Sequence, residues 1–388
     1  MKRKSVDWIL ASAVTLLLLM GLIMVFSASS MIAKFEYHNM LFFFQKQIVW
    51  GALSLVFMVG FSKLDYKILK RHGLPLLLLM VSIVLLLGLF AFGAYSHGAR
   101  RWYRLGFIRF QPSEFAKLSV IIYTAYYLSV KENRLKDWKK GLLPLISLVG
   151  LTVLLIYPQP DLSTSLMILM IAGALIFVSP VPLRHLLAVL LAAVPFAIFT
   201  LIRNPYQWGR VQHWWTALHD PAHAAYQLKQ SLIGLGRGGF LGHGLGQSVQ
   251  KFLFLPDSHT DFIFSIVGEE FGFLGTTLIL LLFLLIFFRG IAITRRVHDK
   301  FGRYLALGIT LNIVLYAFIN AGVVSALLPT TGLPMPYFSY GGSSLLFLSI
   351  ATGILLNISR HTGSELDGLL EKSQSGKLLT KKIVITTE

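Results

Sequence analysis

The chain has 388 residues, of which 55% are hydrophobic and only 13% are charged. A soluble domain of this length could not cover so much apolar surface, so the composition indicates a polytopic membrane protein. The absence of cysteine excludes disulfides, thiolate metal sites and cysteine nucleophiles. The formal charge of +18 does not indicate a nucleic-acid partner, because the basic residues lie in short segments between apolar runs, where membrane topology and anionic lipid explain them.

Apolar runs near the length that crosses a bilayer, about 20 residues, recur along the whole chain. The first follows MKRK and resembles a signal peptide, but it is too long and lacks a small-residue cleavage site, so we interpret it as a membrane helix. The sequence predicts an all-α polytopic membrane protein with about ten transmembrane helices, a membrane domain over 1–361 and a disordered, cytoplasmic tail over 362–388. The predicted helices lie at about 8–28, 43–62, 74–94, 112–130, 141–157, 164–180, 184–202, 262–288, 303–326 and 341–358.

Basic residues divide unevenly between the two sides of this bundle. With a cytoplasmic N-terminus, 23 of the 35 lysines and arginines lie on the cytoplasmic side and 11 on the outer side, while Lys117 lies within a helix. The positive-inside rule then predicts that both termini are cytoplasmic. One large extracytoplasmic loop, 203–261, joins helices 7 and 8.

The outer basic residues are concentrated in two places. Arg100, Arg101, Arg104 and Arg109 share one short segment, and the long loop holds five more, including Arg210. Positive charge against the topological bias indicates a negatively charged ligand at the outer surface. Contact with anionic lipid headgroups is the alternative.

The long loop has features of ordered structure. Residues 225–236 have helical spacing with apolar residues on one face, and the glycine series GRGGFLGHGLGQS follows at 236–248. This series lacks the lysine of a phosphate-binding loop and the context of a dinucleotide site. The chain has eleven histidines, and none of the five in the long loop has an HxxxH or HExxH spacing on a helix, so no metal site is predicted.

Acidic residues gather where the loop enters the next membrane helix, in KFLFLPDSHTDFIFSIVGEE at 251–270. A carboxylate at the mouth of a membrane helix is a functional candidate, and Asp261 is the first of these. The alternative is that Thr260 or Asp261 caps the helix, with Asp257 solvating the loop.

Further polar residues lie at other outer helix ends. Glu114 and Lys117 share one helix face, where a structural ion pair is the alternative to a catalytic role. Asp161 lies in an outer loop between two apolar runs, and the alternative to a functional role is that Asp161 or Ser163 caps the next helix. The segment PTTGLPMPYFSYGGSS at 329–344 is rich in proline and glycine and predicts a re-entrant or broken helix.

Carboxylates and arginines thus converge on the outer leaflet without a nucleotide site. An outward-facing enzyme acting on a phosphate-bearing lipid would need such a set, and so would a lipid transporter. Because the charge stops near the outer face, the pattern favours an enzyme.

Several motifs resemble the SEDS family (shape, elongation, division and sporulation proteins) over residues 8–361. The motifs are GARRW at 98–102, FQPSEFAK at 110–117, QPDLSTS at 159–165, GLGQSVQKFLFLPDSHTDFIFSIVGEE at 244–270 and GLPMPYFSYGGSS at 332–344. VGEE and PTTGLPMPYFSYGGSS are more similar to the cell-division members than to the elongation members.

The resemblance implies a peptidoglycan glycosyltransferase that polymerises lipid II at the outer face of the cytoplasmic membrane during septal wall synthesis. Asp261 matches the proposed catalytic aspartate, which would deprotonate the acceptor hydroxyl for an inverting transfer that releases undecaprenyl diphosphate. The candidate substrate-binding residues are Arg100, Arg101, Arg210, Glu114, Lys117, Asp161, Lys251, His259 and Ser343.

The resemblance also implies partners and alternatives. The partners are a class B penicillin-binding protein that acts as transpeptidase, other divisome proteins, and membrane lipid. A divalent cation, Mg²⁺ or Mn²⁺, would assist the leaving diphosphate, although the sequence has no evident ligand set. The alternative functions are a lipid II flippase and a non-catalytic division scaffold.

Overall fold

A computed structural model describes residues 5–71, 73–96, 99–106, 108–159 and 161–362. The predicted disordered tail at 362–388 lies outside these residues, apart from its first residue. The α-helices are α1 (Trp8–Tyr37), α2 (Phe42–Lys63), α3 (Leu74–Phe92), α4 (Pro112–Val130), α5 (Leu143–Ile156), α6 (Leu162–Val178), α7 (Leu183–Arg203), α8 (Pro205–His219), α9 (Tyr226–Gly238), α10 (Ile263–Arg296), α11 (Lys300–Val324) and α12 (Gly342–Arg360). Short helical turns lie at η1 (Tyr66–Lys70), η2 (Glu132–Arg134), η3 (Trp138–Leu142) and η4 (Pro221–His223), and the strands are β1 (Ala94–Ser96), β2 (Ala99–Leu105) and β3 (Ile108–Phe110).

Each of the ten predicted apolar runs forms a helix. Eight helices in the described ranges are long and apolar enough to cross a membrane. The other two predicted runs form α6, a shorter apolar helix, and α4, which carries Glu114 and Lys117. The predicted polytopic, mainly helical fold is therefore confirmed.

The segment between α3 and α4, predicted only as a loop, contains a small antiparallel sheet. Its strands pair in the order β1-β2-β3, and Arg104 lies opposite Arg109 in the register of β2 and β3. The strands are only 3, 7 and 3 residues long, so their alternation is too short to be read from the sequence.

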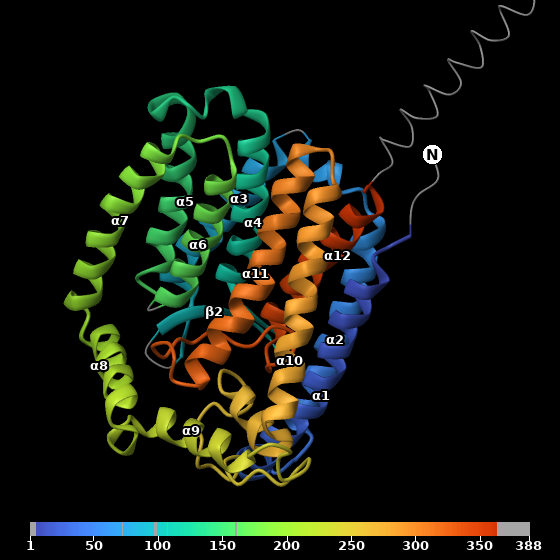
Figure 1. Ribbon diagram of the computed structural model, residues 1–388, viewed down its shortest axis with the longest axis vertical. Coiled ribbons are helices and arrows are strands. Elements are labelled where there is room, and N and C mark those ends of the chain that lie inside the picture. Colours follow the sequence, from blue (N-terminus) through green and yellow to red (C-terminus); the bar gives the residue numbers. More distant parts are fainter. Residues whose placement is uncertain (1–4, 72, 97–98, 107, 160, 363–388) are drawn as a thin grey trace, which may run out of the picture.

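The centre of the bundle is α11, which contacts α4, α6, α10 and α12 (Figure 1). In α11, 78% of the most apolar 18-residue stretch is buried. In α7, which runs along one edge of the bundle, none of the residues whose burial is described in the corresponding stretch is buried (Figure 1). In a membrane, the apolar surface of α7 has lipid as its natural neighbour.

The two ends of the described chain lie together. The backbone N–H of Asp7 donates to Ser359 Oγ at 3.1 Å, and Asp7 also forms an ion pair with Arg289 at 2.7 Å. Both ends are therefore on one side of the bundle, as an even number of crossings requires. The helices α8 and α9 and the glycine-rich segment lie at the opposite end (Figure 1).

The helix α10 is broken at Gly272, where the backbone has φ 64° and ψ −161°. The glycine-rich segment fills the break: the N–H groups of Phe273 and Leu274 donate to the carbonyls of Gly239 and Phe240, at 2.9 and 3.1 Å. A Cβ at position 272 would lie 2.4 Å from the nitrogen of Gly242, so glycine is required there. The loop backbone thus replaces the hydrogen bonds that the break removes from the helix.

Candidate active site

Asp261 lies in the loop that leads into α10, and its main chain is held from two sides. Its carbonyl accepts a hydrogen bond from Asn320 Nδ2 at 2.7 Å. The carbonyls of Thr260 and His259 accept bonds from Ser339 Oγ at 2.6 Å and from the backbone N–H of Tyr340 at 2.9 Å. The loop is therefore fixed between the end of α11 and the proline-rich segment before α12.

The capping alternative for Asp261 is wrong. The N-cap of α10 is Phe262, and no side chain accepts a capping bond there. The carboxylate of Asp261 is consequently not used by the helix, and Gly332 lies close to it: a Cβ on Gly332 would be 3.6 Å from Oδ2.

The surroundings of Asp261 disfavour its charged form. The pKa of the Asp261 carboxyl is raised to about 7: burial is the largest cause, the charges of Asp257 and Asp161 act in the same direction, and those of Arg210 and Arg101 lower it. A carboxylate with this pKa is suited to accepting a proton near neutral pH. The same charges show that the fold brings Arg101, Asp161, Arg210 and Asp261 into one neighbourhood, although they are distant in the sequence.

Two of the candidate arginines are oriented by neighbours. Arg101 Nε donates to the carbonyl of Gln159 at 2.7 Å. Arg210 donates to the Tyr206 hydroxyl at 2.8 Å, and its guanidinium lies 4.7 Å from the centre of that ring. Arg100 has a different partner: its Nη1 donates to the carbonyl of Phe90 at 2.7 Å. Its charge is not among those that shift the pKa of Asp261.

Two buried charged residues, Glu114 and Lys117, lie in the first turns of α4. Glu114 and Lys117 form an ion pair at 2.9 Å, and Lys117 also donates to the Tyr316 hydroxyl. Both charged residues are almost fully buried, so the ion-pair alternative describes their geometry. Asp161 caps α6, since its Oδ1 accepts from the backbone N–H of Thr164 at 3.2 Å, and the capping alternative is confirmed for this residue.

The three remaining candidates have protein partners. Lys251 Nζ lies 3.6 Å from Glu270 Oε1, and Ser343 Oγ donates to the carbonyl of Arg109 at 2.8 Å. The ring of His259 packs against Phe43 at 4.6 Å, and burial lowers its pKa to about 4, against the opposing charge of Asp257. The geometry gives these residues structural contacts, and their contact with substrate stays a prediction.

An open groove of about 670 Å³ adjoins the Asp261 loop at Thr260. One wall is the apolar face of α2, and Val49 is 66% exposed there. Cationic side chains, Lys46 and Arg109, belong to the lining, together with Trp102, Tyr340 and Gly341. The groove suits an extended apolar chain that ends in an anionic group.

Sequence reasoning missed two buried residues that hold the loop, Asn320 and Ser339. Asn320 is one of two asparagines in the apolar run of α11, and an asparagine inside a predicted membrane helix is a signal that could have identified it. Ser339 has no such signal, because serine is common in segments of this composition.

The described residues contain no group of three or more His, Asp or Glu side chains that could hold a metal ion. Any cation here would need a substrate to supply further oxygen ligands.

Comparison with known proteins gives one consistent family. The model of the family described as "Cell cycle protein", FTSW_RODA_SPOVE, matches residues 7–364. The chain is 36% identical to a probable peptidoglycan glycosyltransferase FtsW of Geobacter sp. (strain M18) over 353 residues, which are 91% of this chain and 96% of the relative. It is also 36% identical to stage V sporulation protein E of Bacillus subtilis (strain 168), over 93% of this chain and 99% of the relative.

Two solved structures share the fold. One chain comes from a structure described as "Structural coordination of polymerization and crosslinking by a peptidoglycan synthase complex"; it has a TM-score of 0.74 and 29% identity, and the match covers 92% of this chain and 99% of that one. The rod shape determining protein RodA of Thermus thermophilus has a TM-score of 0.68 and 28% identity, with 92% of this chain and 97% of that one covered. The chain therefore belongs to the SEDS family of cell cycle proteins, which FtsW, RodA and stage V sporulation protein E represent.

Proposed function

We propose that this chain is a peptidoglycan glycosyltransferase that polymerises lipid II at the outer face of the cytoplasmic membrane. The observation that carries the proposal is the position of Asp261: a carboxylate with a raised pKa, near Arg101 and Arg210 and beside an apolar groove of about 670 Å³. A base, cations for a diphosphate and space for a polyprenyl chain are the three requirements of this reaction.

The chemistry begins with the acceptor sugar. Asp261 removes the proton from the 4-hydroxyl of the acceptor, and that oxygen attacks the anomeric carbon of the donor. The bond between this carbon and the diphosphate oxygen breaks, the configuration inverts, and undecaprenyl diphosphate leaves with the bonding electrons. The proton stays on Asp261 until water removes it, which a pKa near 7 allows.

The leaving group determines the role of the basic residues. Arg101 and Arg210 are the arginines whose charges reach Asp261, so they stabilise the diphosphate as its negative charge develops. Lys46 and Arg109 line the groove, where they attract the same group as the lipid enters from the bilayer. The polyprenyl chain lies along the apolar wall of α2.

A divalent cation, Mg²⁺ or Mn²⁺, would take part of its oxygen ligands from the substrate diphosphate and would assist its departure. The carboxylates whose charges act on Asp261 are Asp257 and Asp161, and Asp161 already caps α6. These residues do not form a metal cage by themselves.

The partner we propose is a class B penicillin-binding protein, a transpeptidase that crosslinks the glycan as it forms. The solved relative from a complex that coordinates polymerization and crosslinking supports this partner. The relatives named FtsW support action at the division septum of the cytoplasmic membrane, together with other division proteins.

A lipid II flippase is the alternative, and the buried pair of Glu114 and Lys117 is the observation in its favour. A transport path would require polar residues to continue inward. Beyond Lys117, however, the small space between α4 and α6 is lined by one polar side chain, Thr124, and six aliphatic ones: Val120, Ile121, Ile168, Ile171, Ala172 and Leu175. The polymerase is therefore the better supported function.

The two functions are separated by measuring both in the same proteoliposomes. The purified chain and its transpeptidase partner are reconstituted with fluorescent lipid II, and glycan strands and movement between leaflets are recorded together. We expect glycan strands without faster movement between leaflets. Movement without glycan would support the flippase, and an intact complex with neither activity would support a scaffold.

A further inference from the structure

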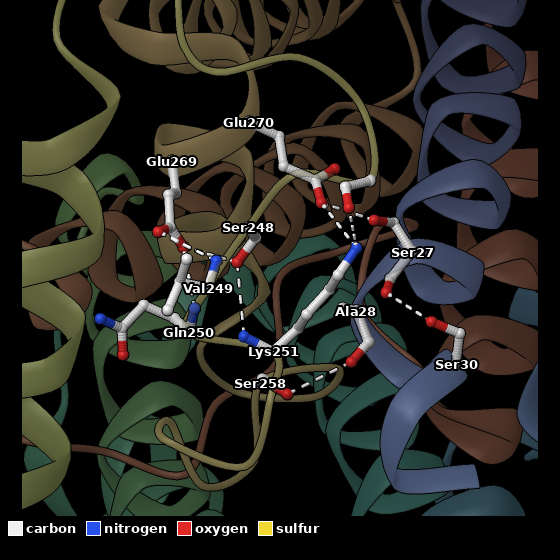
Figure 2. Close-up of polar contacts among 11 residues, drawn as sticks. Ser27, Ala28, Ser30, Ser248, Val249, Gln250, Lys251, Ser258, Glu269 and Glu270 are labelled. Carbon is white, nitrogen blue, oxygen red and sulfur yellow. Dashed lines mark hydrogen bonds and ion pairs between the residues drawn. The ribbon is translucent and has the colours of Figure 1, made fainter. Parts of the chain in front are cut away.

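Two adjacent carboxylates of α10, Glu269 and Glu270, are fully buried and take no part in the proposed chemistry. Figure 2 shows both beside the loop that follows the glycine-rich segment. Burying a carboxylate is unfavourable unless it is well hydrogen-bonded, so each needs a compensating set of donors.

Glu269 has such a set, and it comes from consecutive residues. Its carboxylate accepts hydrogen bonds from the backbone N–H groups of Val249 and Gln250, both at 3.1 Å, and from Ser248 Oγ (Figure 2). Arg237 Nε adds an ion-pair contact at 3.5 Å, with a side chain that is 45% exposed. Backbone N–H groups aimed at one carboxylate form an anion-binding turn, and here the anion belongs to the protein itself.

Glu270 is bound differently. It accepts from Ser27 Oγ of α1 at 2.6 Å and lies 3.6 Å from Lys251 Nζ (Figure 2). Through these two contacts Glu270 binds one side chain of the loop, that of Lys251, and no backbone N–H group. Of the two carboxylates, Glu269 is the one that fixes the path of the main chain.

The residues that Glu269 holds begin the loop that ends at Asp261. Ser248 Oγ also accepts from the N–H of Lys251 at 3.3 Å, which extends the anchor by one residue. The other end of the loop is held by Asn320 and Ser339, as described above. Between the two anchors, Phe252, Leu253 and Phe254 are exposed, whereas Leu255 is buried and Ser258 Oγ donates to the carbonyl of Ala28 at 3.4 Å. The exposed residues 252–254, next to the Glu269 anchor, are therefore the part of the loop that packing fixes least.

We propose that Glu269 is a positioning residue: its buried carboxylate anchors residues 248–250 and thereby holds the loop that places Asp261 at the site. Its effect on the reaction rests on the proposed function, whereas its effect on the loop does not. A glutamine at this position has one acceptor oxygen and an NH₂ group, which would face a backbone N–H, so that part of the anchor is lost.

The chain has no cysteine, which allows a single spin label on the loop. Phe254→Cys, labelled with a nitroxide, is combined with Glu269→Gln or with Ser248→Ala. The control is Ser265→Ala, which removes a buried hydroxyl of α10 that donates to the carbonyl of Ser231 in α9 at 2.8 Å. Nitroxide mobility, thermal unfolding, and kcat and KM for lipid II are measured on the complex with the transpeptidase.

We expect Glu269→Gln to mobilise the label and to lower kcat by about 10²-fold, the size of effect that small displacements of a reacting group produce, with KM within about twofold. Ser248→Ala shifts both measurements in the same direction by a smaller amount, and Ser265→Ala shifts neither. If Glu269→Gln does not fold, the same measurements on Ser248→Ala test the proposal.

The proposal is overturned if the label in the folded variants is as immobile as in the parent, whatever happens to activity. A mobile label with unchanged kcat overturns the positioning role. If the parent itself makes no glycan, the proposed function fails, while label mobility still decides whether Glu269 anchors the loop.

Discussion

Asn320 of α11 donates one amide hydrogen to the main-chain carbonyl of Asp261 at 2.7 Å and the other to the carbonyl of Leu333 at 2.8 Å. Asn320 is 1% exposed, so water does not replace these bonds. One amide thus joins the loop that carries the candidate base to the proline-rich segment, which brings Gly332 against the carboxylate. The position of Asp261 is set through its backbone, and its side chain is left for chemistry.

Replacing Asn320 by leucine tests this bridge. The substitution keeps the volume and leaves two buried carbonyls without a donor, at a cost of about 1–3 kcal/mol each. We expect lower thermal stability and a fall in kcat of about tenfold or more, since the loop loses its fixed position.

The matched control is Asn357→Leu, at the other end of the bundle. Asn357 also makes two buried bonds, donating to the carbonyl of Ser62 at 2.9 Å and accepting from the N–H of Tyr66 at 3.0 Å. It should lose similar stability and keep its kcat at permissive temperature. Equal activity losses in the two variants would assign the effect of Asn320 to stability alone.

The rate should depend on pH through Asp261. Burial raises its pKa to about 7, and a general base acts only when deprotonated, so kcat rises as pH increases toward 7 and levels off above it. Arg210 opposes this rise in pKa, so Arg210→Gln should move the curve to higher pH. Initial rates of polymerisation between pH 5 and 9 measure both, and a rate independent of pH across that range would contradict the assignment.

The same pKa predicts that Asp261→Asn stabilises the fold. The folded-state pKa lies above the ordinary value of 3.8, so the wild type loses stability as pH rises from about 4 to about 7 and no further above that. An asparagine does not ionise, so its advantage in melting temperature grows through this window and is constant above pH 7. Thermal unfolding at several pH values checks this, with Glu36→Gln, an exposed carboxylate, as control. A variant no more stable than wild type at pH 8 would contradict the burial argument.

The break in α10 predicts a sharp difference between two glycines. Gly272→Ala places a Cβ 2.4 Å from the nitrogen of Gly242, at a residue with φ 64°, so we expect a loss of more than about 1 kcal/mol and little folded protein. Gly236→Ala meets no atom within 4 Å and lies in α9, so it should be neutral or slightly stabilising. Yield and thermal unfolding of the two variants provide the comparison, and an equally stable Gly272→Ala would contradict the fitted break.

Apolar length was enough to predict the membrane helices, because a helix that crosses a bilayer must satisfy its own backbone and present an apolar surface. The break at Gly272 was not predictable, since a single glycine is tolerated in many helices and Gly268 and Gly275, in the same run, do not break the helix. Its cause is the fit of residues 239–244 against α10, a contact that local patterns do not encode.

In the candidate site, too, some residues could be predicted from the sequence and others could not. Asp261 could be identified, because acidic residues are few in this chain and this one lies beside the start of a membrane helix, in a motif that resembles the SEDS family. The role of Glu269 was hidden, since its partners lie about twenty residues away and two of them are backbone groups, which have no residue type to read. Lys251 was predicted to bind substrate because it is basic and extracytoplasmic, and only the fold shows Glu270 beside it.

The most direct test of the central claim compares the wild type with Asp261→Asn in polymerisation of purified lipid II, with the transpeptidase partner bound and the amount of folded complex matched. Loss of a general base lowers such rates by about 10²–10⁴-fold, and we expect a fall of that size with the complex intact. Equal rates of glycan formation by the two proteins would contradict the role of Asp261 and would direct the search for the base to Glu114 or Asp161.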